Sequence, residues 1–267
     1  MSRRYLIALA LLMVQGCASV APEPDTSTRA MVPEIRPGVL AGYIAPSALP
    51  NALAFLPPPP AEGSAAMAAD RAASETFLAM QGSERFEQAA RDVDLTFPGA
   101  ETKFQCQLGT RVSEAETPAL YRMLRRSMVD AGLATYSAKN EYKRARPFMA
   151  NGRPTCTPET EAMLREDGSY PSGHSALGWA WGLLLSSLAP EQSSALLARG
   201  WAFGQSRAVC NVHWQSDVDA GRLVAAAVVA KLHTLDTFRQ DFEAARAELE
   251  SAYARGLEPA IGCDQVD

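Results

Sequence analysis

Reactive side chains gather in three short clusters of a chain that contains only three histidines. The first cluster is basic: Lys139 and Arg146 lie seven residues apart in the segment KNEYKRARP, and Pro147 follows directly. Residues seven apart on a helix project from one face, two turns from each other, and Pro147 disfavours helical geometry at Arg146. The spacing therefore predicts a helix that ends at Arg146 and presents two fixed cations, although a solvated basic face would show the same pattern.

The second cluster is the sequence GSYPSGH at 168–174, which an apolar segment follows at once. Ser172 is a natural N-cap for a helix over that segment, and Gly173 lets the backbone approach a ligand closely. Because unpaired N–H groups at a helix start attract anions, His174 would lie at the rim of an anion cradle. A plain capping turn with an incidental histidine is the alternative.

The third cluster runs from Ser206 and Arg207 through His213 to Asp217. His213 and Asp217 are four residues apart, so they would share one face of a helix. A carboxylate there can accept the Nδ1 proton of the imidazole and leave the Nε2 lone pair free, which activates a histidine as a nucleophile or base. A core ion pair or a satisfied buried histidine would show the same spacing.

Together the clusters supply three cations, a backbone anion cradle and two histidines. A phosphoryl group in transfer spreads its charge over three equatorial oxygens, and stabilising it is largely a matter of positioning and electrostatics. Guanidinium groups suit those oxygens because they bind in a bidentate fork. One histidine can attack in line while the other protonates the departing alkoxide. The inventory predicts phosphoryl transfer without a metal.

The motifs K-x6-RP, PSGH and SR-x5-H-x3-D, in this order, resemble the three-part signature of the type 2 phosphatidic-acid phosphatase and vanadium haloperoxidase superfamily. The segments LPPPPAEGS, SAKNEYKRARPF, DGSYPSGH and GQSRAVCNVHWQSDVDAGR extend the similarity to the class A bacterial non-specific acid phosphatases, over about 43–250. The chain departs from that family at Cys106, at Cys263 and at a lipoprotein-like site near its N-terminus.

The resemblance implies hydrolysis of phosphomonoesters through a phosphohistidine, with no cofactor and with phosphotransfer to an alcohol as a side activity. His213 would be the nucleophile, oriented by Asp217, and His174 would be the general acid and then the base. It also implies a homo-oligomer. The groups that would hold the phosphate are Lys139, Arg146, Ser172, the backbone of Gly173, and Arg207.

Three other functions share some of these features. A vanadate-dependent haloperoxidase would use the same anion site, since vanadate mimics the phosphoryl transition state, but it resembles this chain in the three motifs alone. A membrane lipid phosphatase shares the motifs but needs spanning helices. A non-catalytic phosphate-binding lipoprotein would not need the pair of histidines and the carboxylate beside them.

The first residues predict export. Arg3 and Arg4 precede a short apolar stretch, Leu6 to Val14, as in a signal peptide. Gly16-Cys17 then resembles a lipoprotein processing site, and two outcomes stay open: lipidation of Cys17 or cleavage after residue 18. Either one places the mature chain in the periplasm, and the first anchors it to the membrane.

The remaining cysteines are even in number, which in an exported protein fits two disulfides with three alternative connectivities. No two of them have the C-x-x-C spacing of a metal site. These cysteines are Cys106, Cys156, Cys210 and Cys263.

These side chains require a helical scaffold. Apolar residues at helical spacing, separated by proline and glycine, predict an all-α, single-domain bundle with the active site between core helices. The most apolar segment, Ala176 to Ala189, is too short to span a membrane and reads as a buried core helix. Helices are expected at about 64–81, 84–94, 115–131, 134–146, 158–166, 173–188, 191–209, 213–233 and 235–254.

Composition sets the remaining limits. The formal charge of -5 and pI near 5.4 argue against a nucleic-acid partner, so any anion must be bound by a local cluster of cations. A signal peptide is expected at 1–18, a Pro-rich N-terminal arm at 19–62, the helical domain at 63–255 and a C-terminal tail at 256–267.

Overall fold

Helices account for most of the residues that the computed structural model describes, residues 32–263, and the all-α prediction is confirmed. The predicted signal peptide, Cys17 and the last four residues of the predicted tail lie outside the described residues. The longer helices are α1 (Ala65–Leu78), α2 (Glu84–Arg91), α4 (Pro118–Leu133), α8 (Gly173–Leu188), α9 (Ser193–Val209), α10 (Gln215–Leu232) and α11 (Asp236–Ala254).

Short elements connect them. The short α-helices are α3 (Gln105–Leu108), α5 (Tyr136–Tyr142), α6 (Pro147–Asn151) and α7 (Glu161–Glu166). The 3₁₀ helices are η2 (Pro46–Ala48), η3 (Ala52–Ala54), η4 (Ala100–Phe104), η5 (Pro158–Thr160) and η6 (Pro190–Gln192). Strands β1 (Glu34–Arg36) and β2 (Val39–Leu40) pair antiparallel, and both are too short to show a period of two in the sequence.

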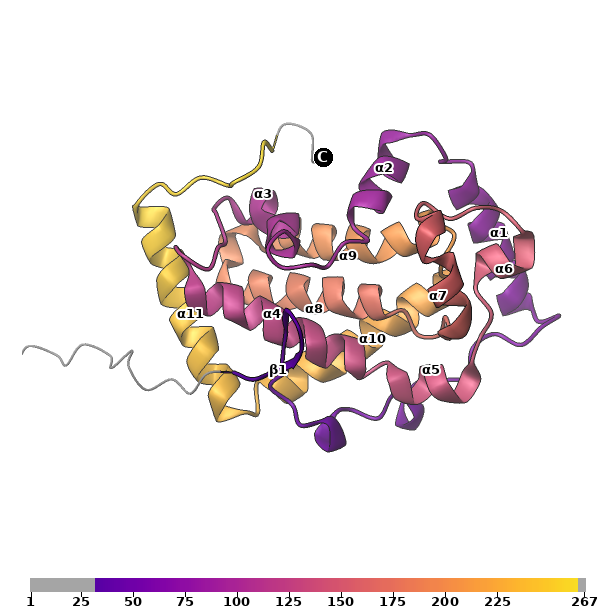
Figure 1. Cartoon of the computed structure of the whole chain (residues 1–267), viewed down its shortest axis with the longest axis horizontal. Coiled ribbons are helices and arrows are strands. Elements are labelled where there is room, and N and C mark those ends of the chain that lie inside the picture. Colours follow the sequence, from indigo (N-terminus) through magenta and orange to yellow (C-terminus); the bar gives the residue numbers. More distant parts are fainter. Residues whose placement is uncertain (1–31, 264–267) are drawn as a thin grey trace, which may run out of the picture. The chain divides into compact units, whose positions relative to one another are not determined.

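The apolar helix α8 forms the centre of the core, as its composition predicts. It packs against α4, α9 and α10, while α11 packs on α4 (Figure 1). Trp181 and Leu184 of α8 are fully buried, and the Trp181 indole donates a hydrogen bond to the Leu124 carbonyl of α4. A central helix of this kind fixes the position of both its neighbours and its own N-terminus.

Glycines allow the central helices to approach closely. A Cβ on Gly200 of α9 would lie 2.8 Å from the carbonyl oxygen of Gly178 in α8. A Cβ on Gly221 of α10 would lie 2.5 Å from the carbonyl oxygen of Ser172, at the start of α8. Helix α10 is therefore held directly against the PSGH turn.

The described part of the Pro-rich segment packs on the helices. Tyr43 and Ile44 belong to the main core, and their backbone N–H groups donate to the carboxylate of Asp130 at 2.9 and 3.0 Å. Further along, the Tyr170 hydroxyl donates to the Pro57 carbonyl at 2.8 Å. This segment covers the base of the loop that carries the second motif.

Both predicted disulfides are present, and the structure chooses between the alternative connectivities. Cys106 pairs with Cys263, and Cys156 pairs with Cys210. Among the described residues, no helix combines the length and apolar character needed to cross a membrane.

Candidate active site

The prediction of one helix through the first motif is wrong. Helix α5 ends at Tyr142, Lys143 adopts the left-handed conformation with φ 43°, and Arg146 is extended because it precedes Pro147, which opens α6. Lys139 and Arg146 therefore do not share a helix face. The chain between them turns instead, and both side chains reach the carboxylate of Asp167.

The PSGH turn is built as predicted. Ser172 caps α8, with its hydroxyl oxygen accepting a hydrogen bond from the Ser175 N–H at 3.2 Å. The Ser172 N–H in turn donates to the Asp217 carbonyl at 2.9 Å. The second motif is thereby joined to the third by backbone as well as by packing.

His213 and Asp217 meet, but not through helical spacing. His213 lies before α10, and the Asp217 carboxylate caps that helix by accepting from the Trp214 N–H at 2.8 Å. Its Oδ2 atom lies 3.4 Å from Nδ1 of His213. The cap fixes the carboxylate, and the carboxylate faces the imidazole.

The tautomer of His213 follows from its other nitrogen. Nη1 of Arg146 lies 3.0 Å from Nε2 of His213, and because arginine can only donate, Nε2 must be the acceptor. The proton of the neutral ring is then on Nδ1, toward Asp217. Nε2 keeps its lone pair on the side of the cations.

Arg144 is a site residue that the motif analysis did not single out. Its Nη1 donates to Asp217 at 2.5 Å and its Nη2 donates to Asp70 of α1 at 2.7 Å. Ser216 joins the same network through its N–H and hydroxyl, both directed at Asp70. Arg144 stands inside the segment KNEYKRARP, which was the available signal, whereas nothing in the sequence around Asp70 pointed to the site.

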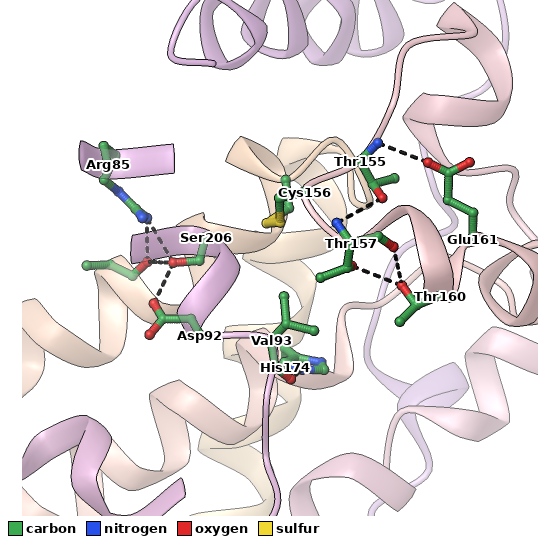
Figure 2. Close-up of a disulfide and its surroundings, with 12 residues drawn as sticks. Arg85, Asp92, Val93, Thr155, Cys156, Thr157, Thr160, Glu161, His174 and Ser206 are labelled. Carbon is green, nitrogen blue, oxygen red and sulfur yellow. Dashed lines mark hydrogen bonds between the residues drawn. A yellow bond between two sulfur atoms is a disulfide. The ribbon is translucent and has the colours of Figure 1, made fainter. Parts of the chain in front are cut away.

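His174 contacts the chain that follows α2. Its Nε2 lies 3.0 Å from the carbonyl oxygen of Val93, and the two residues adjoin in Figure 2. A carbonyl can only accept, so Nε2 carries a proton and Nδ1 is the nitrogen left to gain or lose one.

The third motif is anchored from its first residue. The Ser206 hydroxyl donates to the buried carboxylate of Asp92 at 2.6 Å, and Arg85 donates to Ser206 at 3.0 Å (Figure 2). Arg207, the next residue, is also buried, yet its Nε and Nη1 atoms have no hydrogen-bond partner within residues 32–263. A buried guanidinium with unmet donors is suited to receive an anion.

Burial and mutual repulsion shift the charges of these groups. Burial and the charge of Arg146 lower the pKa of Lys139 to about 8 and that of Arg207 to about 9. Burial and Arg207 lower the pKa of His174 to about 3, and burial with Arg146 lowers the pKa of His213 well below its ordinary value. Both imidazoles are neutral in the empty site, which concentrates positive charge on the lysine and the two arginines.

Buried Asp217 has the opposite shift. Burial raises its pKa, and the adjacent Arg144 partly offsets that rise. A carboxylate in this setting depends on its arginine partner to stay ionised.

Among the described residues, the three motifs thus meet at one place, with two histidines, three cations and a helix start around it. An anion held by the cations would lie against Nε2 of His213. This arrangement can bind a phosphate-like group and attack it.

Comparisons with known proteins agree with this chemistry. The sequence model of the PAP2 superfamily matches residues 123–241, the part that contains all three motifs. The chain is 40% identical over 232 residues to a non-specific acid phosphatase of Providencia stuartii, covering 86% of this chain and 90% of the relative.

Two further relatives are similar. A non-specific acid phosphatase of Salmonella typhimurium is 42% identical over 200 residues, which is 74% of this chain and 80% of the relative. An acid phosphatase of Zymomonas mobilis is 38% identical over 200 residues, 75% of this chain and 76% of the relative.

The fold and the three motifs define a member of the PAP2 superfamily. Within it the chain belongs to the bacterial non-specific acid phosphatases of class A, as the resemblance of its motifs implied, and it is a phosphoric monoester hydrolase.

Proposed function

We propose that this protein hydrolyses phosphomonoesters through a covalent phosphohistidine on Nε2 of His213, with charge on the phosphate balanced by Lys139, Arg146 and Arg207 in place of a metal ion. Nε2 attacks the phosphorus in line, and the bond between phosphorus and the ester oxygen breaks. The departing alkoxide takes a proton from Nδ1 of protonated His174.

The second step returns the enzyme to its starting state. His174 takes a proton from water as the water oxygen attacks phosphorus, the phosphorus–nitrogen bond breaks, and inorganic phosphate leaves. An alcohol in place of water would give phosphotransfer by the same route. Burial first and the charge of Arg207 second keep the His174 imidazole neutral, and a bound dianionic phosphate would raise the pKa of His174 by placing negative charge beside it and offsetting Arg207.

One observation carries the proposal: Nε2 of His213 is an acceptor directed at Arg146, while Nδ1 faces Asp217. An imidazole held in this tautomer among cations is a neutral nucleophile placed where a phosphate would be bound. The positive charge that forms on the phosphorylated ring would be stabilised by Asp217.

We further propose that the chain is exported to the periplasm and acts there as a homo-oligomer. The support for export is the signal-like N-terminus and the two disulfides, which form in oxidising compartments. The homo-oligomer rests on the family resemblance alone. Lipidation of Cys17 belongs to the same proposal, and mass spectrometry of the protein isolated from membranes would test it.

The mechanism is tested by hydrolysis of a chromogenic phosphomonoester by wild type and His213→Ala, each with and without EDTA. We expect wild-type activity to persist in EDTA and the variant to lose at least about 10³-fold in kcat. Loss of wild-type activity in EDTA, with recovery on adding a divalent metal, would rule out a metal-independent route.

A further inference from the structure

The carboxylate of Asp167 forms ion pairs with two of the three proposed phosphate-binding cations. Asp167 follows α7, and its Oδ2 atom lies 3.2 Å from Nζ of Lys139 and 3.0 Å from Nη2 of Arg146. Its side chain is 32% exposed, whereas Lys139 and Arg146 are 4% and 1% exposed. Asp167 therefore stands between these cations and solvent.

The donors of Arg146 leave no vacancy for a phosphate oxygen. Nε donates to the carbonyls of Leu164 and Asp167, and Nη1 contacts the Val212 carbonyl and Nε2 of His213. Nη2 is taken by the Asp167 carboxylate and, at 3.5 Å, by the Gly168 carbonyl. The hydrogen bonds to backbone carbonyls fix the guanidinium group in place. A phosphate can therefore bind Arg146 chiefly by replacing the Asp167 carboxylate.

Lys139 is bound in a similar way. Two of its three N–H donors are engaged, one by the Asp167 carboxylate and one by the Gly168 carbonyl. Arg207 differs, since two of its buried nitrogens have no hydrogen-bond partner among the described residues. An arriving anion therefore meets one open cation and two cations that share one internal carboxylate.

A cavity beside the site offers space for the displaced Asp167 carboxylate. The cavity has a volume of about 340 Å³, and its charged lining includes Asp167 and Glu166 together with Lys143, Arg144 and Arg165. Because basic residues outnumber acidic ones in this lining, it would accept the carboxylate after it leaves Lys139 and Arg146.

We propose that Asp167 is an affinity-determining residue: it competes with phosphate for Lys139 and Arg146, and every phosphate group must displace it to bind. Asp167 weakens the binding of substrate and of inorganic phosphate alike, which favours release of the product. This inference rests on the proposed phosphate site, and the competition concerns binding rather than the covalent step.

The test is the dissociation constant of inorganic phosphate, measured by calorimetry near pH 6 on the full mature chain. Asp167→Asn keeps the size of the side chain and removes its charge, and we expect it to bind phosphate roughly tenfold more tightly than wild type. Glu166→Gln makes the same change of net charge one residue away, at an exposed side chain, and should leave the dissociation constant within about twofold.

Thermal unfolding of each variant establishes that it is folded, and Asp167→Ser serves as a second removal of the carboxylate. Unchanged or weaker phosphate binding in folded Asp167→Asn and Asp167→Ser would overturn the proposal, as would an equal gain in Glu166→Gln. Phosphomonoester hydrolysis by the same wild-type preparation separates the two claims. If wild type is inactive but Asp167→Asn binds phosphate about tenfold more tightly than wild type, only the proposed function is contradicted. If wild type is active but the two proteins bind phosphate equally, only the role of Asp167 is contradicted.

Discussion

At the scale of single residues, the charged groups of the site are buried, so solvent screens their interactions weakly. His213 is neutral because it is buried and cations surround it, and it is oriented because Asp217 faces one nitrogen and Arg146 the other. Asp217 is itself held by Arg144. The order of control therefore runs from Arg144 to Asp217 to His213, the proposed nucleophile.

This order predicts that Arg144 is a positioning residue. Arg144→Gln removes the cation that keeps buried Asp217 ionised, so the pKa of Asp217 rises further and the carboxylate protonates at a higher pH. We expect kcat to fall by roughly 10²-fold with little change in KM, and the acid limb of the kcat profile to move to higher pH. Arg144→Lys keeps the positive charge and should partly restore both kcat and the position of the acid limb. If Arg144 had only a structural role, neither variant would move the acid limb.

The depressed pKa of His174 predicts a pH-dependent stability. Between about pH 3 and its unfolded value of 6.5, His174 binds a proton in the unfolded chain but not in the empty folded protein. The free energy of unfolding should therefore decrease as pH falls through this window, by up to about 1.4 kcal/mol per pH unit from this residue.

Denaturant unfolding of wild type and His174→Asn at several pH values between 4 and 6 measures this contribution. The variant should show the shallower dependence on pH. Equal slopes would mean that His174 is protonated in the folded protein or is not sheltered from water.

The sequence predicted which residues would form the candidate site better than it predicted how those residues are positioned. The types and order of Lys139, His174 and His213 were enough to predict a phosphoryl site. The helical spacings used to bring them together were wrong at Arg146 and at His213, because a left-handed residue and a helix cap, respectively, place these side chains. Asp167 stands directly before the second motif, yet its contact with two distant cations depends on tertiary structure alone.

At the scale of elements, the site depends on how closely α10 approaches the start of α8. A Cβ on Gly221 would meet the Ser172 carbonyl at 2.5 Å and the Ser175 Cβ at 2.9 Å, and both belong to the turn at the phosphate cradle. Backbone cannot yield as a flexible side chain can, so the helices would have to separate.

Gly221→Ala should destabilise the protein by about 1–3 kcal/mol and reduce kcat, as measured by denaturant unfolding and by phosphatase assay. Gly132→Ala in α4 is the matched control, because in the described part of the chain only its own helix lies within 4 Å of its Cβ position. It should be neutral or stabilise the helix by up to about 1 kcal/mol. Equal behaviour of the two variants would show that the α8–α10 contact is looser than described.

The positions of the long helices were predictable from the sequence because their apolar periodicity is sustained. The short elements were not: β1, α3 and α6 contain too few residues to show a period, and they form because the surrounding core fixes them. Pro147 was expected to end a helix at Arg146, but Arg146 is extended and the proline begins α6 instead.

At the scale of the whole molecule, two disulfides close long loops but have different relations to the site. Cys156–Cys210 spans 54 residues and fixes the turn between Arg207 and His213, whereas Cys106–Cys263 spans 157 residues and holds the end of the chain on α3. The sequence predicted two pairs, but pairing depends on distance in the folded chain.

Replacing either pair by serine should lower the free energy of unfolding by about 3–5 kcal/mol. Only the Cys156/Cys210 double variant should also lower kcat at 25 °C, because it releases the turn that carries the proposed nucleophile, His213. Thermal unfolding and kcat of the two double variants measure both effects. Equal loss of kcat in both variants would contradict a special link between Cys156–Cys210 and the site.

The most direct test of the mechanism is the position of the covalent phosphate. Wild type, His174→Ala and His213→Ala are mixed with a phosphomonoester labelled in its phosphate, quenched in base, digested and examined by mass spectrometry. We predict label on Nε2 of His213 in the first two proteins, formed and lost more slowly in His174→Ala because both steps use His174, and none in His213→Ala. Label on another residue, or label that persists in His213→Ala, would contradict a phosphohistidine on His213.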